Sequence, residues 1–323
     1  MSEQDPGFLD QKYLVDPYLN WAKAEGVPIV TGATLDLFAL ELGDWARFGM
    51  KGAICHLDAR CDYLTAFVFE LASGASSAPV RHLYEEVFYV LAGAGETEVT
   101  LANGMTQTIV WEPRKLFAVP VNATARHRAI GAIPARLVAL NDLRYLMGLY
   151  RNEAFLFGNS APMHGRQEKA VAAGLLAYPR TCALTNGEWA SVPLADMSVG
   201  IDLATIDAKA STLARRQMQG RHILGVEGEG FTLSFVSDTS EMVRTDWKHG
   251  VLSALTGMSF HQHFNAGSTS ARLISVELGS VSSPMFRSRR AAYGDTEVYA
   301  SGAAVLAERA DAKALFAQAC AQA

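Results

Sequence analysis

The residues of this chain whose types and spacing could bind a metal ion lie in one stretch, PVRHLYEEVFYVLAGAG (79–95). His82 and Glu86 stand four residues apart in it. The residues that follow are apolar on both faces of an alternating pattern, which is typical of a strand buried in a sandwich or barrel. Gly93 and Gly95 then mark a tight turn, where a Cβ atom would clash. We therefore expect an imidazole and a carboxylate placed for a metal at the start of a buried strand.

The elements that must position these side chains are predicted to be strands. Short apolar segments follow one another through two parts of the chain, separated by Gly, Pro and Asn turns, and no helical period survives in the first of them. Such spacing indicates an antiparallel sandwich or barrel. We predict an all-β chain with five parts: an N-terminal arm (1–61), a first β-domain (62–143), a connector of helix and loop (144–200), a second β-domain (201–285), and a basic loop with a C-terminal helix (286–323).

The N-terminal arm has two predicted uses. It mixes a short helical piece, VDPYLNWAKAEG, with a strand-like segment, LDLFALELGDW. Arms of this kind either pair with a neighbouring subunit or wrap their own barrel, and the sequence leaves both open.

An internal repeat relates the two β-domains. Repeats fix the architecture of a chain and are sought before other patterns. Four anchors keep one register at an offset of 135 or 136 residues: Gly93 with Gly228, Gly95 with Gly230, Trp111 with Trp247, and ARLVAL (135–140) with ARLISV (271–276). We therefore predict two copies of one β-domain.

The same register distributes the metal-type residues unevenly. A later histidine occurs in both copies, whereas the earlier histidine and the carboxylate occur only in the first. The aligned pairs are His127 with His263, His82 with Gln217, Val80 with Arg215, and Glu86 with Arg221 or its neighbour His222.

With these residues in place, the chain resembles a bicupin, which has two cupin jelly-roll domains in one polypeptide. The first cupin motif, G-x5-H-x-H-x3,4-E-x6-G, resembles SGASSAPVRHLYEEVFYVLAG, with His82, Glu86 and Gly93 at the family spacing. Val80 stands where the motif has its first histidine. The resemblance implies a tandem of double-stranded β-helix domains over about 62–143 and 205–280.

The second cupin motif, G-x5-P-x-G-x2-H-x3-N, resembles EPRKLFAVPVNATARHRAIG in a looser way. Pro120 and His127 match it with longer spacing, and the final asparagine is absent. FHQHFN (260–265) resembles this motif in the second copy, where only the glycines of the first motif remain. The resemblance therefore implies that His82, Glu86 and His127 are the metal ligands of the first barrel.

Two imidazoles and one carboxylate with open coordination positions suit a non-haem Fe(II) centre. We take Fe(II) as the first expectation and Mn, Ni or Zn as alternatives. A metal held this way supports oxidative cleavage of a carbon–carbon bond in a diol, enol or hydroxy acid. It also supports Lewis-acid proton transfer, which gives isomerisation or elimination.

The first functional hypothesis is a dioxygenase-like bicupin oxidoreductase that acts on a small oxygenated organic acid, aromatic acids among them. Arg81 or Arg126 would orient the anionic substrate. A second hypothesis is a metal-free binding or structural cupin, because Val80, Arg215 and Gln217 stand where ligands are usual. A third is a metal-dependent lyase or isomerase of the same architecture.

The second barrel has its own candidate residues. His222, His261 and His263 are available there, and the last two lie two residues apart, hence on one face of a strand. Arg215 and Gln217 occupy the positions of the usual motif-one histidines. An arginine repels a cation and suits a carboxylate, so we favour a degenerate structural copy over a second metal site.

Composition excludes several other functions. Half of the residues are hydrophobic and the formal charge is −5, which indicates a globular protein without a basic field for nucleic acid. No apolar run is long enough for a membrane span, and the first residues lack the features of a signal peptide. The cysteines, which form no CxxC pair, predict reduced thiols in a cytoplasmic protein: Cys55, Cys61, Cys182 and Cys320. We expect a homo-oligomer.

Overall fold

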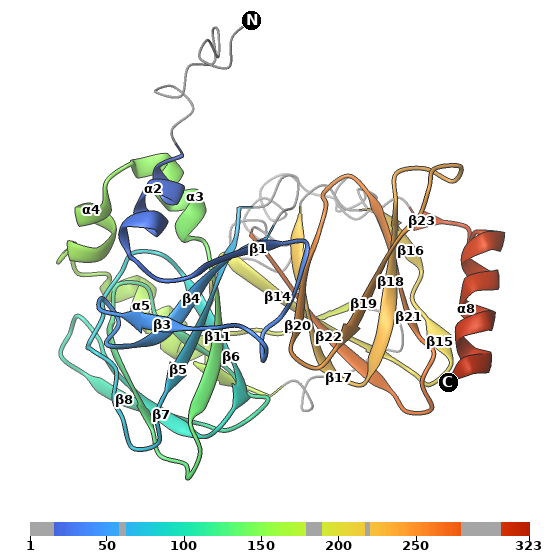
Figure 1. The fold of residues 1–323 in the computed structure, drawn as a ribbon. Helices are drawn as coiled ribbons and strands as arrows, with labels where there is room; N and C mark the ends of the chain where they lie inside the picture. Colours follow the sequence, from blue (N-terminus) through green and yellow to red (C-terminus); the bar gives the residue numbers. More distant parts are fainter. Residues whose placement is uncertain (1–15, 58–62, 179–188, 217–219, 279–304) are drawn as a thin grey trace, which may run out of the picture.

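Two β-barrels lie beside one another along the chain (Figure 1). The computed structural model describes residues 16–57, 63–178, 189–216, 220–278 and 305–323. Each barrel is built from two facing sheets, the first drawn mainly in blue to green and the second in yellow to orange (Figure 1). The predicted all-β tandem is confirmed.

The first barrel joins a large sheet to a three-stranded sheet. The large sheet runs in the order β1 (Ile29–Gly32), β4 (Met50–Leu57), β5 (Thr65–Leu71), β11 (Ala135–Asn141), β6 (Glu86–Ala92), β9 (Leu116–Val119) and β12 (Leu176–Ala177), with β3 (Gly43–Trp45) on β4. The small sheet runs β10 (Thr124–Ala129), β7 (Gly95–Thr100), β8 (Thr106–Trp111).

The second barrel repeats this plan. One sheet runs β13 (Trp189–Ser191), β14 (Val199–Ile206), β22 (Ala271–Leu278), β17 (Arg221–Glu227), β20 (Val251–Leu255) and β2 (Thr34–Asp36). The other runs β19 (Val243–Lys248), β18 (Glu229–Phe235), β21 (Phe260–Asn265), β16 (Ala214–Arg216) and β23 (Val305–Leu306), with β15 (Ala210–Ser211) on β21. The order β5–β11–β6–β9 in the first barrel thus corresponds to β14–β22–β17–β20 in the second.

Glycine holds the same turn in both copies. Gly93 and Gly228 follow β6 and β17 with φ of +75° and +71°. A Cβ on Gly93 would lie 2.6 Å from Ala135 Cα, and one on Gly228 would lie 2.9 Å from Ala271 Cβ. Only glycine tolerates both the positive φ and the close approach, which explains why these positions carried the repeat in the sequence.

The described part of the N-terminal arm pairs with strands of both barrels. Helix α2 (Pro17–Ala24) begins at an Asp16 cap and precedes β1, which pairs in parallel with β4 of the first barrel. Strand β2 then pairs with β20 of the second barrel. Of the two predicted uses, the described part of the arm therefore wraps its own barrels and joins both. Because β1, β3 and β4 belong to the first large sheet, that sheet begins well before residue 62.

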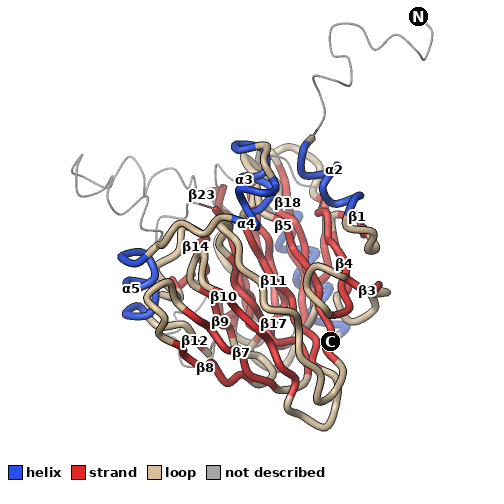
Figure 2. The backbone as a smooth tube through the Cα atoms, turned by 90° about the vertical axis from the view of Figure 1, so that its left-hand side faces the viewer, coloured by secondary structure: helices blue, strands red, loops and turns tan. Residues whose placement is uncertain are grey.

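The connector contains three helices. They are α3 (Leu143–Tyr150), α4 (Glu153–Gly158) and α5 (His164–Ala173). Helices α2, α3 and α4 gather at one end of the first barrel (Figures 1 and 2). No described helix is long and apolar enough to cross a membrane.

At the C-terminus, helix α8 (Ala310–Gln322) covers the outer sheet face of the second barrel (Figure 1). Ala312 and Phe316 pack there against Phe231 and Phe264. The helix was predicted to begin near residue 301 and begins at Ala310; the basic loop lies outside the described residues. Cys55 and Cys320 are free thiols, while the other two cysteines also lie outside the described residues.

One apolar core runs through the first barrel and into the second. The cluster that holds Val87 and Tyr89 of β6 also holds Leu224 of β17 and Val276 of β22. A smaller cluster around Ile223 and Trp247 lies inside the second barrel. Alternate residues of β17 therefore serve two cores, one between the domains and one inside the barrel.

Candidate functional site

Three side chains predicted as metal ligands line one small cavity inside the first barrel. His82 lies in the segment before β6, Glu86 is the first residue of β6, and His127 lies in β10 of the opposite sheet. The cavity has a volume of about 10 Å³, on the order of what one water needs. The rest of its wall is mainly apolar: Phe48, Met50, Phe69, Ser77, Val80, Phe88, Val119 and Ala125.

His82 aims one ring nitrogen at the carboxylate. Its Nδ1 lies 2.9 Å from the carbonyl oxygen of Tyr84, and its ring stacks on the Tyr84 ring at 3.5 Å. A carbonyl only accepts, so Nδ1 carries the proton and Nε2 of the neutral ring presents a lone pair. That Nε2 lies 3.4 Å from Glu86 Oε2. A lone pair facing a carboxylate is favourable only with a proton or a metal ion between them.

Glu86 is held from its other side. It is 2% exposed, and its Oε1 accepts a long hydrogen bond of 3.4 Å from Asn141 Nδ2 across the β6–β11 pair. The preceding residue, Glu85, accepts hydrogen bonds from the backbone N–H groups of Ser198 and Val199 and forms an ion pair with Arg166. The start of β6 is therefore anchored to the connector and to strand β14 of the second barrel.

His127 is fixed through hydroxyl groups. Its backbone N–H donates to Ser77 Oγ at 2.9 Å, and its Nδ1 lies 2.8 Å from Thr97 Oγ1. Thr97 Oγ1 also accepts from Trp111 Nε1 at 2.9 Å. Burial and the neighbouring His82 lower the pKa of His127 to about 4. The ring is therefore neutral near pH 7, and Nε2 is the nitrogen left for the cavity.

The donor chemistry of this site fits a divalent metal on the His82–Glu86 side. Donor atoms at the usual bond length of about 2.1 Å on adjacent positions of one ion lie about 3 Å apart, close to the observed 3.4 Å. Within the described residues, however, no three His, Cys, Asp or Glu side chains are close enough to hold an ion as they stand. His127 must therefore approach the other two for a three-ligand site to close.

Two predicted substrate-orienting arginines lie away from this cavity. Arg126 is exposed, because it alternates with the inward-facing His127 on β10, and its Nε donates to Ser77 O at 3.3 Å. Arg81 is half-buried and follows Val80, which does line the cavity. Their placement does not support a role in orienting a substrate there, and the alternation of a strand is the reason.

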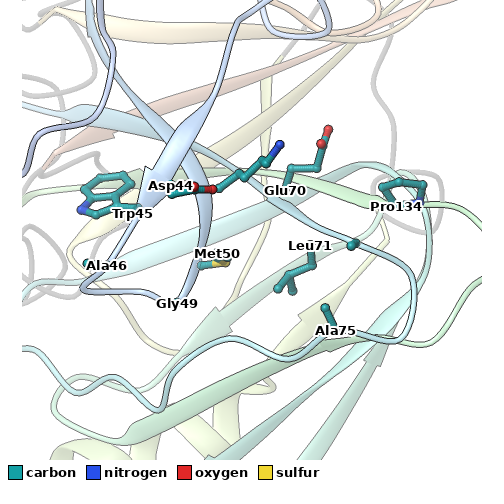
Figure 3. A pocket seen from close by; sticks show the side chains of 11 residues that line it. Asp44, Trp45, Ala46, Gly49, Met50, Glu70, Leu71, Ala75 and Pro134 are labelled. Atoms are coloured by element: carbon teal, nitrogen blue, oxygen red, sulfur yellow. The ribbon is translucent and has the colours of Figure 1, made fainter.

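A larger groove lies at one end of the same barrel (Figure 3). It has a volume of about 480 Å³, which is within the range of small-molecule sites. Trp45, Met50 and Leu71 form part of its apolar floor, with Lys51 and Glu70 among its charged residues. Met50 lines both this groove and the small cavity. Size alone does not make the groove the reactive centre, because the candidate ligands lie in the inner cavity.

The second barrel places an arginine where the first has its carboxylate. Glu86 pairs in register with Val119 of β9 and Asn141 of β11. Arg221 pairs in register with Leu255 of β20, and the register of β17 with β22 places it opposite Glu277. This settles the open alignment in favour of Arg221. Its Nη2 forms a buried ion pair with Glu277 Oε2 at 2.6 Å.

The two later histidines of the second barrel are held by hydrogen bonds. His261 uses both ring nitrogens, with Ser234 Oγ at 3.0 Å and Thr256 O at 2.9 Å, so neither is left for a metal. His263 Nδ1 lies 2.8 Å from Thr232 Oγ1. Burial lowers the pKa of His261 to about 4 and that of His263 to about 3, with Arg221 adding to both shifts.

The remaining second-barrel candidates do not join these histidines in a metal site. His222 alternates with Arg221 on β17 and so faces the core between the domains. Arg215 is partly exposed on β16, opposite His261. Gln217 lies outside the described residues. The degenerate structural copy expected from the sequence stays a prediction, and the ion pair of Arg221 with Glu277 is compatible with it.

Sequence reasoning missed the residues that orient the ligands. Asn141 gave no signal, because it contacts Glu86 only when β6 and β11 pair. Tyr84 gave none because it binds His82 Nδ1 through a backbone carbonyl, which every residue has. Ser77 and Thr97 did leave one: Thr212 and Thr232 stand 135 residues later and make the same contacts to His263.

Comparison with solved structures identifies the fold as that of a bicupin. An oxalate decarboxylase of Lactobacillus farciminis in complex with formate matches with a TM-score of 0.57 at 12% identity over 83% of this chain and 92% of that one. An oxalate decarboxylase of Bacillus subtilis matches at 0.55 and 11% identity over 77% and 78%. Vicilin of hazelnut, Corylus avellana, matches at 0.53 and 10% identity over 77% and 86%.

These likenesses show the fold alone. The chain therefore has the fold of two tandem cupin domains, which is the architecture that the motifs predicted. No protein-family model and no curated protein matches its sequence.

Proposed function

We propose that the first barrel binds a divalent metal through His82, Glu86 and His127 and that the protein is a metal-dependent enzyme acting on a small oxygenated organic acid. The observation that carries this proposal is the convergence of these three side chains, from two facing sheets, on one cavity. Fe(II) suits the donor set, and the similar Bacillus subtilis decarboxylase has Mn(II) centres, so Mn(II) or Fe(II) is the metal to test.

The three candidate ligands would have different roles because their charges differ. His82 and His127 offer neutral Nε2 donors, and Glu86 brings the negative charge that offsets part of the charge of the ion. A metal in this position supplies Lewis-acid polarisation of a bound carboxylate or hydroxyl oxygen. The apolar wall limits water around it, which strengthens every electrostatic interaction inside.

The reaction class we propose is cleavage of a carbon–carbon bond beside an oxygenated carbon. Oxidative cleavage was the first expectation from the sequence, and decarboxylation is the activity of the similar enzymes named above. Oxygen uptake measured with a panel of small hydroxy and keto acids separates the two. Product formed with oxygen consumption supports a dioxygenase, and product formed without net consumption supports a lyase.

Metal analysis tests the proposal, and the repeat supplies its control. After growth and refolding with Mn(II) or Fe(II), we expect close to one metal per chain in the wild type. His82→Ala and His127→Ala should lose most of it, whereas His263→Ala, at the equivalent position of the second barrel, should keep it. Less than about a tenth of an equivalent in the wild type, or equal loss in His263→Ala, contradicts the proposal.

The second candidate is a metal-free binding cupin. It is favoured by one observation, that the three donors as they stand do not form a closed set. A ligand that binds only the native state raises its stability. Stabilisation by organic acids in a chelator, with none from Mn(II) or Fe(II), would favour this candidate over the enzyme.

A further inference from the structure

One row of inward-facing residues differs in character between the two barrels. In the first barrel the row across β5, β11, β6 and β9 is aromatic and apolar: Phe67, Ala139, Phe88 and Phe117. In the second barrel the equivalent row across β14, β22, β17 and β20 is largely polar: Asp202, Ser275, Ile223 and Ser253. The correspondence follows from strand order and register, so it does not depend on alignment of these residues in the sequence.

This exchange removes an aromatic stack. In the first barrel Phe117 stacks between Phe88, at 4.7 Å, and Trp111, at 5.8 Å, with nearly parallel rings. In the second barrel Ser253 stands in the place of Phe117, between Ile223 and the side that carries Trp247. A hydroxymethyl group cannot fill the space of a phenyl ring.

Polar atoms without a partner gather around that place. Within the described residues, four of the buried second-barrel atoms that lack a hydrogen-bond partner belong to this wall: Arg221 Nε, Trp247 Nε1, Ser253 Oγ and Ser275 Oγ. Their residues are 4%, 3%, 3% and 0% exposed, respectively. Trp111, the counterpart of Trp247, does satisfy its N–H, on Thr97. Each orphaned buried group costs free energy, so several on one wall call for an occupant that satisfies them.

The charges on this wall define the kind of occupant. Arg221 is neutralised by its ion pair with Glu277. Asp202 belongs to the polar row, and burial and the neighbouring Glu277 raise its pKa to about 6. An anion would therefore meet two carboxyl groups and gain no free cation. The N–H groups of Arg221 and Trp247 can only donate, so the occupant must offer acceptor oxygens.

We propose that the second barrel is a metal-independent binding chamber for a small neutral molecule rich in hydroxyl oxygens. Arg221, Trp247, Ser253 and Ser275 bind those oxygens, and the indole face of Trp247 packs against the carbon atoms. This chamber is independent of the metal site proposed for the first barrel. The two copies of one domain thus serve different ligands.

Saturation-transfer NMR on the full chain tests the chamber with erythritol and xylitol as probes. We expect transfer to both probes in the wild type and a several-fold reduction in Ser275→Ala. Ser253→Phe, which restores the residue of the first barrel, should abolish it. The matched control is Val236→Phe, which adds the same ring at a position that is 66% exposed. This control should behave as the wild type.

Transfer to an anionic probe and the melting temperature of Ser253→Phe are the two further measurements. Malate, as the anionic probe, should give weaker transfer than either polyol, and Ser253→Phe should melt no lower than the wild type because its ring can stack on Trp247 as Phe117 stacks on Trp111. If Ser253→Phe does not fold, Ser253→Ala and Ser275→Ala carry the comparison. The proposal is overturned by absence of polyol transfer in the wild type, by equal transfer in the Ser253 variants, or by stronger transfer to malate.

Discussion

His127 and His263 have the same hydrogen-bond environment in barrels that otherwise differ. Each Nδ1 lies 2.8 Å from a threonine hydroxyl, Thr97 or Thr232, and each backbone N–H donates to a second hydroxyl. A histidine held this way is part of the repeated structure. The residue that distinguishes the two sites is therefore the first residue of β6 or β17, which is a carboxylate, Glu86, in one barrel and a guanidinium, Arg221, in the other.

The Thr97 hydroxyl fixes the ring orientation of His127. Removing this hydroxyl therefore tests the metal proposal without changing a candidate ligand. Thr97→Val deletes the partner of His127 Nδ1 and of Trp111 Nε1 without changing volume. We expect metal affinity to fall by roughly 10–100-fold, as for other groups that orient metal ligands. Competition with a chelator measures it. Thr232→Val, its counterpart, should leave the affinity unchanged, and an equal loss there would show that the effect is only structural.

The buried histidines of the second barrel predict loss of stability in acid. The pKa values of His261 and His263 are about 4 and 3, below the value near 6.5 of an unfolded chain. Below pH 6.5 the unfolded state therefore binds protons that the native state does not. The stabilisation is present above pH 6.5 and is lost as the pH falls toward 4, by up to about 1.4 kcal/mol per pH unit and histidine.

Urea unfolding between pH 7 and pH 4 measures this loss. His261→Gln should make the pH dependence of stability less steep, because it removes one of the protons that the buried histidines take up on unfolding. An unchanged slope in that variant would show that other groups, such as the carboxylates, govern acid unfolding.

At the scale of elements, the glycine turn after β6 is a point where the repeat constrains the fold. Gly93 has φ of +75°, and a Cβ there would lie 2.6 Å from both Ala135 Cα and Pro134 O. Gly74 has a similar φ of +77° but nothing within 4 Å. Gly93→Ala should therefore destabilise the protein by several kcal/mol, and Gly74→Ala by only about 1–2 kcal/mol from backbone strain.

Thermal or urea unfolding of both variants makes the comparison. The shared positive φ is the internal control, so the difference between the variants reports the packing clash alone. Equal losses in the two variants would mean that the turn relaxes away from β11.

The elements show why some features were predictable and others were not. Alternation and turn glycines are local signals, so the strands and the tandem followed from the sequence, as did the inward-facing places of Glu86 on β6 and His127 on β10. Arg126 was misplaced because it is next to His127 in sequence, yet neighbours on a strand face opposite sides. The pairing of β2 with β20 joins residues more than 200 positions apart, and no local pattern encodes it. The distance of His127 from the other two ligands likewise depends on how two sheets pack.

At the scale of the whole molecule, the two barrels share a core and are expected to unfold together. Leu224 and Leu255 lie on neighbouring strands of the second barrel and are 0% and 3% exposed. Leu224 belongs to the core that continues into the first barrel, whereas Leu255 belongs to the core inside its own barrel. Truncation of either residue creates a cavity and costs about 2–5 kcal/mol. The cavity of Leu224→Ala lies in the core that joins the two barrels, whereas that of Leu255→Ala lies inside the second barrel.

Calorimetry of Leu224→Ala and Leu255→Ala tests this coupling. The wild type should unfold in one transition whose van't Hoff and calorimetric enthalpies agree. Leu255→Ala should lower its melting temperature and keep one transition. Leu224→Ala weakens the contact between the domains, so its transition should broaden or split. A split in Leu255→Ala alone, or two transitions already in the wild type, would show that the arm and the shared core do not couple the barrels.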